Sequence, residues 1–326
     1  KFDEKGYIDS LVDKRANREI RGDGYPLNAL ITAEDMPSAW DNWDIDADLD
    51  CKLADNSVLV SREIISHGAA AVIIRSEYKI TKKSTVIQDA FYFSDSPEIR
   101  FDTVMDWQDN HRFLKAAFDT NVYNNFARFE IQYGNVMRPT TRNNSVEKAK
   151  FEVVNHKYTD LSETRFGVSV LNDSKYGISV EGGNLRLSLH KGGNRPDIEG
   201  DKGVHKTVYS LLPHDGGFSA ENVIRPAYEL NIPVIIGKGD FEAVSLVVPE
   251  KENIIVEAIK PCEDNEKAFI ARLYEAEGTH TNCNIRFFDG AKKIEITNML
   301  EEAENELSDN TISFRPFEIK TLKIHY

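Results

Sequence analysis

Hydrophobic and polar residues alternate one by one along many short stretches of this chain. The clearest examples are residues 99–107, Ile-Arg-Phe-Asp-Thr-Val-Met-Asp-Trp, and residues 185–189, Leu-Arg-Leu-Ser-Leu. Because successive side chains of a strand point to opposite faces, this pattern predicts strands with one buried face. The runs are rich in β-branched and aromatic residues, which favours an antiparallel sandwich. Further runs cover residues 57–60, 69–80, 84–93, 126–134, 166–171 and 208–212.

A second series of strands follows a change in composition near residue 237. Its regular spacing is typical of an immunoglobulin-like sandwich. One short helix is predicted at residues 219–230, with Ser219 as its N-cap and Pro226 as the residue that bends or ends it. We therefore predict an all-β fold, with a large antiparallel β-sandwich in residues 1–237 and a smaller sandwich in residues 238–326. The later strands are expected at residues 244–248, 253–259, 268–275, 284–288, 293–297, 311–314 and 318–324.

Charge and cysteine content narrow the possible partners and compartment. The 326 residues include 40 basic and 54 acidic side chains, a net charge of −14, which disfavours nucleic acid and anionic membranes as partners. The three cysteines are far apart and form no C-x-x-C pair, so a reducing compartment is expected. Apolar runs fall short of the ~20 residues that a membrane span needs, and we expect no targeting segment.

One loop concentrates aromatic and acidic side chains. Residues 34–46 contain two of the three tryptophans, Trp40 and Trp43, within a few positions of several acids. Indole rings pack against the C–H faces of sugars while carboxylates accept hydrogen bonds from hydroxyls, so the loop suits a carbohydrate. Such loops also occur as structural corners, and both interpretations stay open here. The acids are Asp35, Asp41, Asp44 and Asp46.

Three further polar segments supply candidate binding residues. Residues 137–145 are rich in hydrogen-bond donors, including Arg138 and Arg142, and either bind hydroxyl groups or anchor an interface with another domain. Asn172 and Asp173 begin a turn rich in Asn, Asp and Gly. A long Gly-rich loop follows at residues 190–205, where binding residues are often found on β scaffolds. Its candidates are Arg195, Asp197, Asp201 and His205.

The loop of residues 34–46 also carries a family resemblance. Pro37-x-x-Trp40-Asp41-x-Trp43-Asp44-Ile45-Asp46 resembles a segment of glycoside hydrolase family 38 α-mannosidases, in the subgroup with bacterial and cytosolic members. The matches extend from residue 5 to residue 323, and they resemble only the C-terminal, β-rich half of such an enzyme. Other matching stretches lie at residues 138–143, 149–153, 160–163, 171–177 and 316–322.

The resemblance implies a galactose-mutarotase-like supersandwich followed by the smaller sandwich. It implies a retaining, zinc-dependent hydrolase that acts on α-linked mannose in the cytoplasm of a bacterial cell. In this family the nucleophilic Asp and the zinc ligands belong to an N-terminal α/β domain, and no stretch of this chain resembles those motifs. We therefore expect no catalytic residue and no metal ligand here, an inactive isolated segment, and the N-terminal catalytic domain as its partner.

The family also places the loop at residues 190–205 near the sugar-binding cleft. Lys191-Gly192-Gly193 replaces the family's R-S-P at this point, which leaves open whether Lys191 or Arg195 faces a ligand. Two alternative functions remain. One is a noncatalytic carbohydrate-binding module, and the other is a mutarotase-like epimerase in which His156 or His205 would work with a nearby acid.

Overall fold

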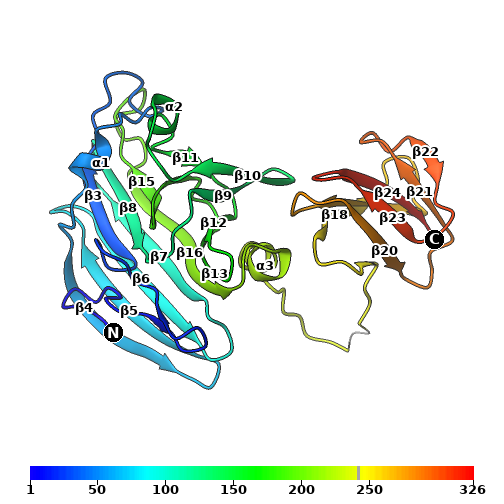
Figure 1. The fold of residues 1–326 in the computed structure, drawn as a ribbon, viewed down its shortest axis with the longest axis horizontal. Coiled ribbons are helices and arrows are strands. Elements are labelled where there is room, and N and C mark those ends of the chain that lie inside the picture. Colours follow the sequence, from blue (N-terminus) through cyan, green and yellow to red (C-terminus); the bar gives the residue numbers. More distant parts are fainter. Residues whose placement is uncertain (241–242) are drawn as a thin grey trace. The chain divides into compact units, whose positions relative to one another are not determined.

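The computed structural model describes residues 1–240 and 243–326, which form two compact units (Figure 1). The larger, unit 1, comprises residues Lys1–Glu130, Met137–Phe218 and Ala227–Asn231. The smaller, unit 2, comprises residues Ile131–Val136, Ser219–Pro226 and Ile232–Tyr326.

A nine-stranded sheet forms one layer of unit 1, apart from the residues of β9 and β10 that lie within 131–136; its order is β10-β9-β12-β13-β16-β7-β6-β5-β4. The pairings from β9 through β4 are antiparallel; Gly203 of β16, for example, lies opposite Trp107 of β7. The strands are β4 (Val58–His67), β5 (Ala71–Lys79), β6 (Thr85–Phe93), β7 (Ile99–Trp107), β9 (Phe126–Ile131), β10 (Gly134–Pro139), β12 (Tyr158–Ser162), β13 (Phe166–Asn172) and β16 (Gly203–Asp215).

A five-stranded sheet forms the other layer, in the order β11-β14-β15-β8-β3. Phe118 of β8 contacts Phe101 of β7 and Tyr209 of β16, with ring centroids 6.2 Å apart in both cases, so the two sheets pack face to face. The strands are β3 (Ala29–Glu34), β8 (Arg112–Asp119), β11 (Val153–Val154), β14 (Gly177–Glu181) and β15 (Asn184–Lys191), and a separate ribbon pairs β1 (Val12–Asp13) with β2 (Arg18–Glu19).

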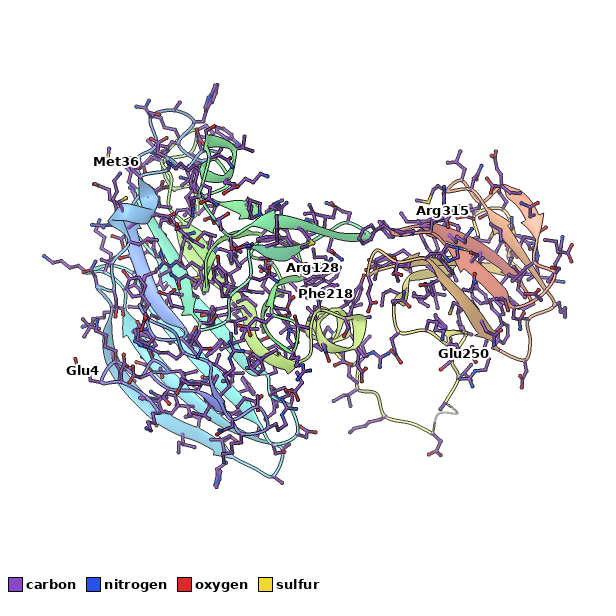
Figure 2. The ribbon with its side chains drawn as sticks, viewed as in Figure 1. Glu4, Met36, Arg128, Phe218, Glu250 and Arg315 are labelled. Atoms are coloured by element: carbon purple, nitrogen blue, oxygen red, sulfur yellow. The ribbon has the colours of Figure 1, made fainter. Side chains whose placement is uncertain are left out.

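The alternating pattern of residues 99–107 appears in β7 as predicted. Its apolar positions, from Ile99 through Phe101 and Met105 to Trp107, are buried between the sheets, whereas Arg100 and Asp102 lie on the other face and pair with each other. The predicted large antiparallel sandwich is therefore confirmed. At the side of the same sheet, Arg128 stacks on Phe218, with its guanidinium carbon 4.7 Å from the ring centroid (Figure 2).

A closed group of polar side chains lies inside this apolar layer. The amide oxygen of Gln88 accepts from Asn28 at 2.6 Å, and its amide nitrogen donates to Thr103 at 2.9 Å and to Tyr209 at 2.8 Å. The Tyr209 hydroxyl donates in turn to Asn28 at 2.7 Å. Each polar atom in these four hydrogen bonds has a partner. The four side chains therefore connect the two sheets without the cost of an unsatisfied buried polar atom.

Strand β4 forms one edge of the nine-stranded sheet. Its register with β5 shifts twice, between Leu59 and Ser61 and between Ile64 and Ser66. Val60 and Ile64 are 53% and 64% exposed. The edge therefore carries exposed apolar side chains and is interrupted by two irregularities.

The helices of the described residues are short. They are α1 (Leu49–Lys52), α2 (Ser145–Lys148), the π-helix η1 (Ala220–Ile224) and α3 (Arg225–Asn231). Ser219 caps η1 by accepting from the Asn222 backbone at 3.0 Å, which confirms the predicted cap. Pro226 is the second residue of α3 and directly follows Arg225, whose backbone N–H donates to the Ala220 carbonyl. Instead of ending the helix, it stands where the π-helix gives way to the α-helix.

Unit 2 is the predicted smaller sandwich. Its sheets run in the orders β17-β20-β23 and β18-β19-β24-β21-β22 and enclose a core that includes Leu273, Phe314 and Leu322. The strands are β17 (Val247–Pro249), β18 (Ile254–Pro261), β19 (Ala268–Glu275), β20 (Thr281–Phe287), β21 (Lys293–Thr297), β22 (Ala303–Glu306), β23 (Thr311–Phe314) and β24 (Ile319–His325).

A fully buried carboxylate organises one end of unit 2. Glu275 accepts from the backbone N–H groups of Glu277, Gly278 and Thr279 at 2.8–2.9 Å, and from that of Phe317 at 3.1 Å. It thereby joins the turn after β19 to the turn before β24. The hydrogen bonds from several N–H groups offset the free-energy cost of burying a charged carboxylate.

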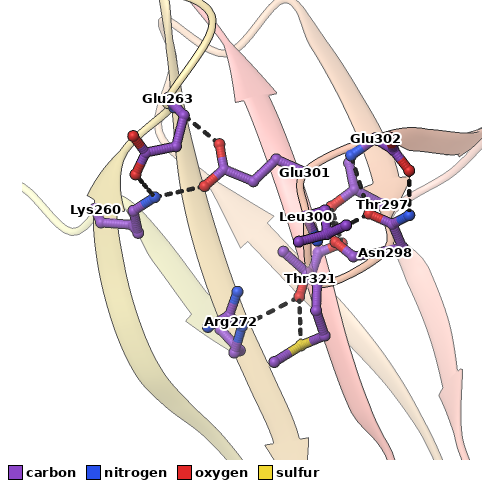
Figure 3. Close-up of polar contacts among 10 residues, drawn as sticks. Lys260, Glu263, Arg272, Thr297, Asn298, Leu300, Glu301, Glu302 and Thr321 are labelled. Atoms are coloured by element: carbon purple, nitrogen blue, oxygen red, sulfur yellow. Dashed lines mark hydrogen bonds and ion pairs between the residues drawn. The ribbon is translucent and has the colours of Figure 1, made fainter.

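Another carboxylate, that of Glu301, pairs with Lys260 and accepts from the backbone of Glu263 at 2.9 Å (Figure 3). The hydrogen bond from Lys260, aided by that backbone bond, lowers the pKa of Glu301 to about 2. A carboxyl whose pKa falls on folding stabilises the fold above its unfolded pKa, and this contribution disappears as the pH falls through the folded value.

The polar group in unit 1 predicts the cost of removing its centre. Gln88→Ala leaves the buried amide nitrogen of Asn28 without its acceptor and removes the donor to Thr103 and Tyr209, so we expect unit 1 to lose about 2–3 kcal/mol of stability. All three tryptophans lie in unit 1, so urea unfolding followed by tryptophan fluorescence measures this unit. Gln108→Ala, at an exposed glutamine, is the matched control and should change little. Equal stability of the two variants would contradict the prediction.

The pair of Lys260 and Glu301 predicts a pH-dependent effect in unit 2. Lys260→Met should lower the melting temperature at pH 7, and the difference from the unmodified protein should shrink as the pH falls from 4.5 towards 2, where Glu301 becomes protonated. Hydrogen exchange of the β19 amides reports on this unit. Lys251→Met, at an exposed lysine, is the control. A deficit that is the same at pH 2 and pH 7 would show that Lys260 acts through packing alone.

Candidate functional site

The candidate site is built around the loop of residues 35–48, which follows β3 and begins near Met36 in Figure 2. Trp40 adopts a left-handed backbone conformation, with φ of 57°, and its carbonyl accepts from the N–H groups of Trp43 at 2.7 Å and Asp44 at 2.9 Å. This tight turn leaves the indoles outside, 72% exposed for Trp40 and 71% for Trp43. Neither indole forms part of a buried corner.

Asp41 anchors this loop to two other segments. Its carboxylate accepts from the backbone N–H groups of Asn194 at 2.6 Å and Arg195 at 3.1 Å, and lies 3.3 Å from Nε2 of His111. Partial burial acts to raise the pKa of Asp41, but the hydrogen bonds from Asn194 and His111 prevail and hold it below the ordinary value. The carboxylate is therefore engaged within the protein, and it joins three turns.

A second connection involves Asp35 and Lys191. The two side chains form an ion pair, and the Lys191 ammonium also donates to the Asp44 carbonyl at 2.9 Å. Burial raises the pKa of Asp35 even though Lys191 acts in the opposite direction. Lys191 is therefore occupied by the loop, whereas the Arg195 side chain is exposed. Asp46 closes the loop by accepting from the Ser38 backbone at 2.9 Å.

The two glycines after Lys191 allow this close packing. A Cβ atom on Gly192 would lie 2.5 Å from the Asp109 carbonyl oxygen, and one on Gly193 would overlap the Asn42 side chain. A side chain on Gly192 would displace the turn at Asp109, and one on Gly193 would displace Asn42 of the loop of residues 35–48.

The remainder of the long loop carries exposed polar groups. Asp197 accepts from the Glu199 backbone at 3.0 Å, and the backbone carbonyl of Asp201 lies 2.6 Å from Nε2 of His205. The ring of His205 lies 4.4 Å from that of His190. The carboxylates of Asp197 and Asp201 face solvent.

The two arginines of residues 137–145 have different surroundings. Arg142 lies 3.4 Å from Asp50 of α1, the helix that follows the tryptophan loop. Arg138 instead donates to the Val154 carbonyl at 2.9 Å and stacks on Phe129. Arg142 thus contacts the helix that follows the loop of residues 35–48, whereas Arg138 contacts strands β9 and β11.

Asn172 and Asp173 occupy a turn within unit 1. Asn172 is fully buried, and its amide nitrogen donates to Asn155 at 3.0 Å and to the His156 carbonyl at 2.6 Å. Asp173 accepts from Thr207 at 2.9 Å. These contacts order the turn between β13 and β14.

A pocket of about 330 Å³ contains further polar residues that the sequence pattern did not single out. Glu152, Lys175 and His190 line it together with Asp201 and His205. One sequence signal was present, since Lys175 belongs to the polar turn of residues 172–177. Their convergence depends on sheet pairing, which a single sequence does not reveal.

Within residues 1–240 and 243–326, no three His, Cys, Asp or Glu side chains gather in an arrangement that could hold a metal ion. Within the same residues, no helix has the length and apolar character needed to cross a bilayer.

Comparisons with known proteins agree with this architecture. The family model described as "Glycosyl hydrolases family 38 C-terminal domain" matches residues 1–199, and "Glycosyl hydrolases family 38 C-terminal beta sandwich domain" matches residues 253–322. The crystal structure of an alpha-mannosidase from Enterococcus faecalis V583 superposes with a TM-score of 0.81 over 99% of this chain and 41% of that chain, at 14% identity, which supports the fold.

Relatives with known names match nearly the whole chain. Alpha-mannosidase 2C1 from Homo sapiens is 33% identical over 99% of this chain, and alpha-mannosidase G from Dictyostelium discoideum is 36% identical over 98%. The chain spans only 32% and 31% of these two proteins, about a third of their length. The chain therefore belongs to glycoside hydrolase family 38 and corresponds to its C-terminal β region.

Proposed function

We propose that this chain is the C-terminal β part of a retaining, zinc-dependent α-mannosidase and that its loops line the cleft that receives α-linked mannose. The observation that carries the proposal is the pair of exposed indoles, Trp40 and Trp43, on a loop that Asp41 holds in place. The similarity to two α-mannosidases along nearly the whole chain supports the same conclusion.

The surface has the chemistry that a sugar requires. An indole face covers the apolar C–H face of a pyranose, and a carboxylate accepts from its hydroxyls. Asp44 lies next to Trp43 and is exposed, and among the described residues its carboxylate accepts only from the adjacent Ile45 backbone. We assign Trp43 and Asp44 to sugar contact and Asp41 to positioning.

The chemical step is assigned to residues outside this chain. A retaining glycosidase uses two carboxyl groups ~5–5.5 Å apart, one as nucleophile and one as acid/base. The family resemblance assigns the nucleophile and the zinc ligands to an N-terminal α/β domain, and the described residues do not fit a zinc site. In this proposal the present chain binds and orients the sugar and restricts the access of water.

The proposed partner is consequently the remainder of the same enzyme. We also propose a cytoplasmic location, as in the cytosolic members that the sequence resembles. Cys51, Cys262 and Cys283 are all unpaired, which suits a reducing compartment.

A noncatalytic carbohydrate-binding module is the second candidate, because exposed indoles serve such a module equally well. The two candidates differ in one measurable respect. In an α-mannosidase the loop contributes to turnover, whereas in a module it contributes only to retention on a glycan.

The proposal predicts distinct effects for neighbouring residues in the full-length enzyme. Trp43→Ala should lower kcat/KM for an aryl α-mannoside at least about tenfold, roughly 1.4 kcal/mol, with little change in melting temperature because the indole is exposed. Asp41→Ala should lower both quantities, since it releases the loop from Asn194 and Arg195. Steady-state kinetics and thermal melting of each variant provide the measurements.

Tyr123→Ala is the matched control. Tyr123 is 56% exposed and follows the end of β8 opposite to Arg112, so it lies away from the loop. This variant should leave kcat/KM unchanged. If Trp43→Ala also leaves kcat/KM unchanged while reducing retention on a mannan matrix, the module replaces the enzyme as the better interpretation.

A further inference from the structure

A pocket of about 780 Å³ lies beside the turn that joins β5 to β6 in unit 1. Its lining contains four basic side chains and only one acid among the described residues. It shares no lining residue with the loop of residues 35–48 or with that of residues 190–205. The basic residues are Lys79, Lys82, Lys83 and Arg112.

The acid of this pocket, Asp109, is already bonded within the protein. Its carboxylate accepts from the hydroxyl groups of Thr81 and Ser84. The Thr81 hydroxyl in turn accepts from the backbone N–H groups of Lys83 and Ser84, both at 3.0 Å. These bonds hold the turn in one conformation and fix the backbone from which Lys82 and Lys83 project.

The basic side chains, by contrast, have no acidic partner. Among the described residues, none of the four forms an ion pair or donates a hydrogen bond from its side chain. Glu34 lies opposite Arg112 in the pairing of β3 with β8, yet no ion pair joins them. Elsewhere on β5 the situation differs, since Arg75 pairs with Asp89 of β6 at 2.7 Å. The four cations are therefore available to an external anion.

The charge of this lining is opposite to that of the whole chain. Four positive charges and one negative charge line the pocket, whereas the chain carries a net charge of −14. Positive charges that gather without a counter-ion repel one another, which raises the free energy of the folded state. An anion in the pocket removes this repulsion, and a dianion removes more of it than a monoanion does.

The size and the residue types of the pocket narrow the class of anion. Its volume lies within the ~300–1,000 Å³ typical of small-molecule sites, which leaves room for an organic group beside the anionic one. Arginine binds phosphate through its planar fork and lysine through its point charge, so both side chains suit the several oxygens of a phosphate. Thr32 and Asn56 add polar groups to the lining.

We propose that this pocket binds a small phosphate monoester, with its dianionic phosphate held by Lys79, Lys82, Lys83 and Arg112. The lysines belong to β5 and the turn after it, and Arg112 belongs to β8, so the ligand contacts both sheets of unit 1. A soluble ester fits better than a phospholipid, because the net charge of −14 opposes approach to an anionic bilayer. The proposal does not rest on the proposed function.

The test is titration of residues 1–326 with glycerol 3-phosphate, measured by isothermal titration calorimetry at low ionic strength. This ester has no pyranose ring that could bind at the tryptophan loop. We expect a Kd of ~1 mM or tighter. Glycerate, a monoanion of similar size, should bind at least about tenfold more weakly, and glycerol should not bind. Raising the NaCl concentration to ~0.5 M should weaken binding of the ester, because salt screens exposed charges.

Variants locate the binding in the pocket. The double variant Lys82→Gln with Lys83→Gln should weaken binding at least about tenfold. Both side chains are exposed and unpaired among the described residues, so the melting temperature without ligand should not fall. The matched control is Lys148→Gln with Lys150→Gln, which also removes two exposed charges from unit 1 and should leave the affinity unchanged.

Arg112→Gln provides a separate check from the other sheet, and it should also weaken binding. The proposal is overturned if the unmodified chain does not bind glycerol 3-phosphate, if glycerate binds as tightly, or if the double variant at Lys82 and Lys83 keeps full affinity. Equal losses in the two double variants would show a general effect of net charge and no site. Binding to vesicles that contain phosphatidic acid, without binding to glycerol 3-phosphate, would contradict the proposal in favour of a lipid headgroup.

This outcome and that of the proposed function are separate. Loss of glycerol 3-phosphate binding leaves the kinetic prediction for Trp43→Ala untouched, because the pocket shares no residue with the tryptophan loop. Likewise, a full-length protein without activity on α-mannosides would remove the proposed function while the phosphate site remained.

Discussion

One carboxylate, that of Asp41, determines whether the candidate site exists as a surface. It accepts two backbone N–H groups from the loop of residues 190–205 and contacts His111 in the turn before β8. Those segments are far apart in sequence, and each would be mobile if exposed alone. A single charged acceptor that satisfies several donors holds them in one geometry, and the indoles of Trp40 and Trp43 are thereby presented outward.

Unit 2 uses the same arrangement, in which one carboxylate accepts from the backbone of more than one turn. Glu275 joins two turns there through their N–H groups. In both units an acid serves structure by accepting from the main chain, while acids that bond only to neighbours remain available to solvent. Acidic side chains in this chain therefore divide by their partners, and the sequence alone does not distinguish the two kinds. The net charge of −14 does not show which acids bond to the main chain and which face solvent.

Much of the fold could be predicted from the sequence, because the alternation of hydrophobic and polar residues indicates both where a strand lies and which of its faces is buried. Residues 99–107 predicted β7 and its inward residues, and Ser219 predicted a cap. The site followed less completely. A polar turn sequence has the same composition whether it is exposed or buried, so the burial of Asn172 was not visible. His190 and Lys175 are brought to one pocket by the hairpin of β14 and β15, whose register the alternation of residues does not fix by itself.

The irregular edge strand β4 has a consequence for the solution behaviour of the isolated chain. Its exposed Val60 and Ile64 are residues that promote intermolecular strand addition and amyloid-like stacking. A neighbouring molecule, however, needs an uninterrupted row of N–H and C=O groups in order to extend the sheet. The register shifts at Ser61 and Ser66 break that row in two places, so β4 presents segments too short to template a second copy.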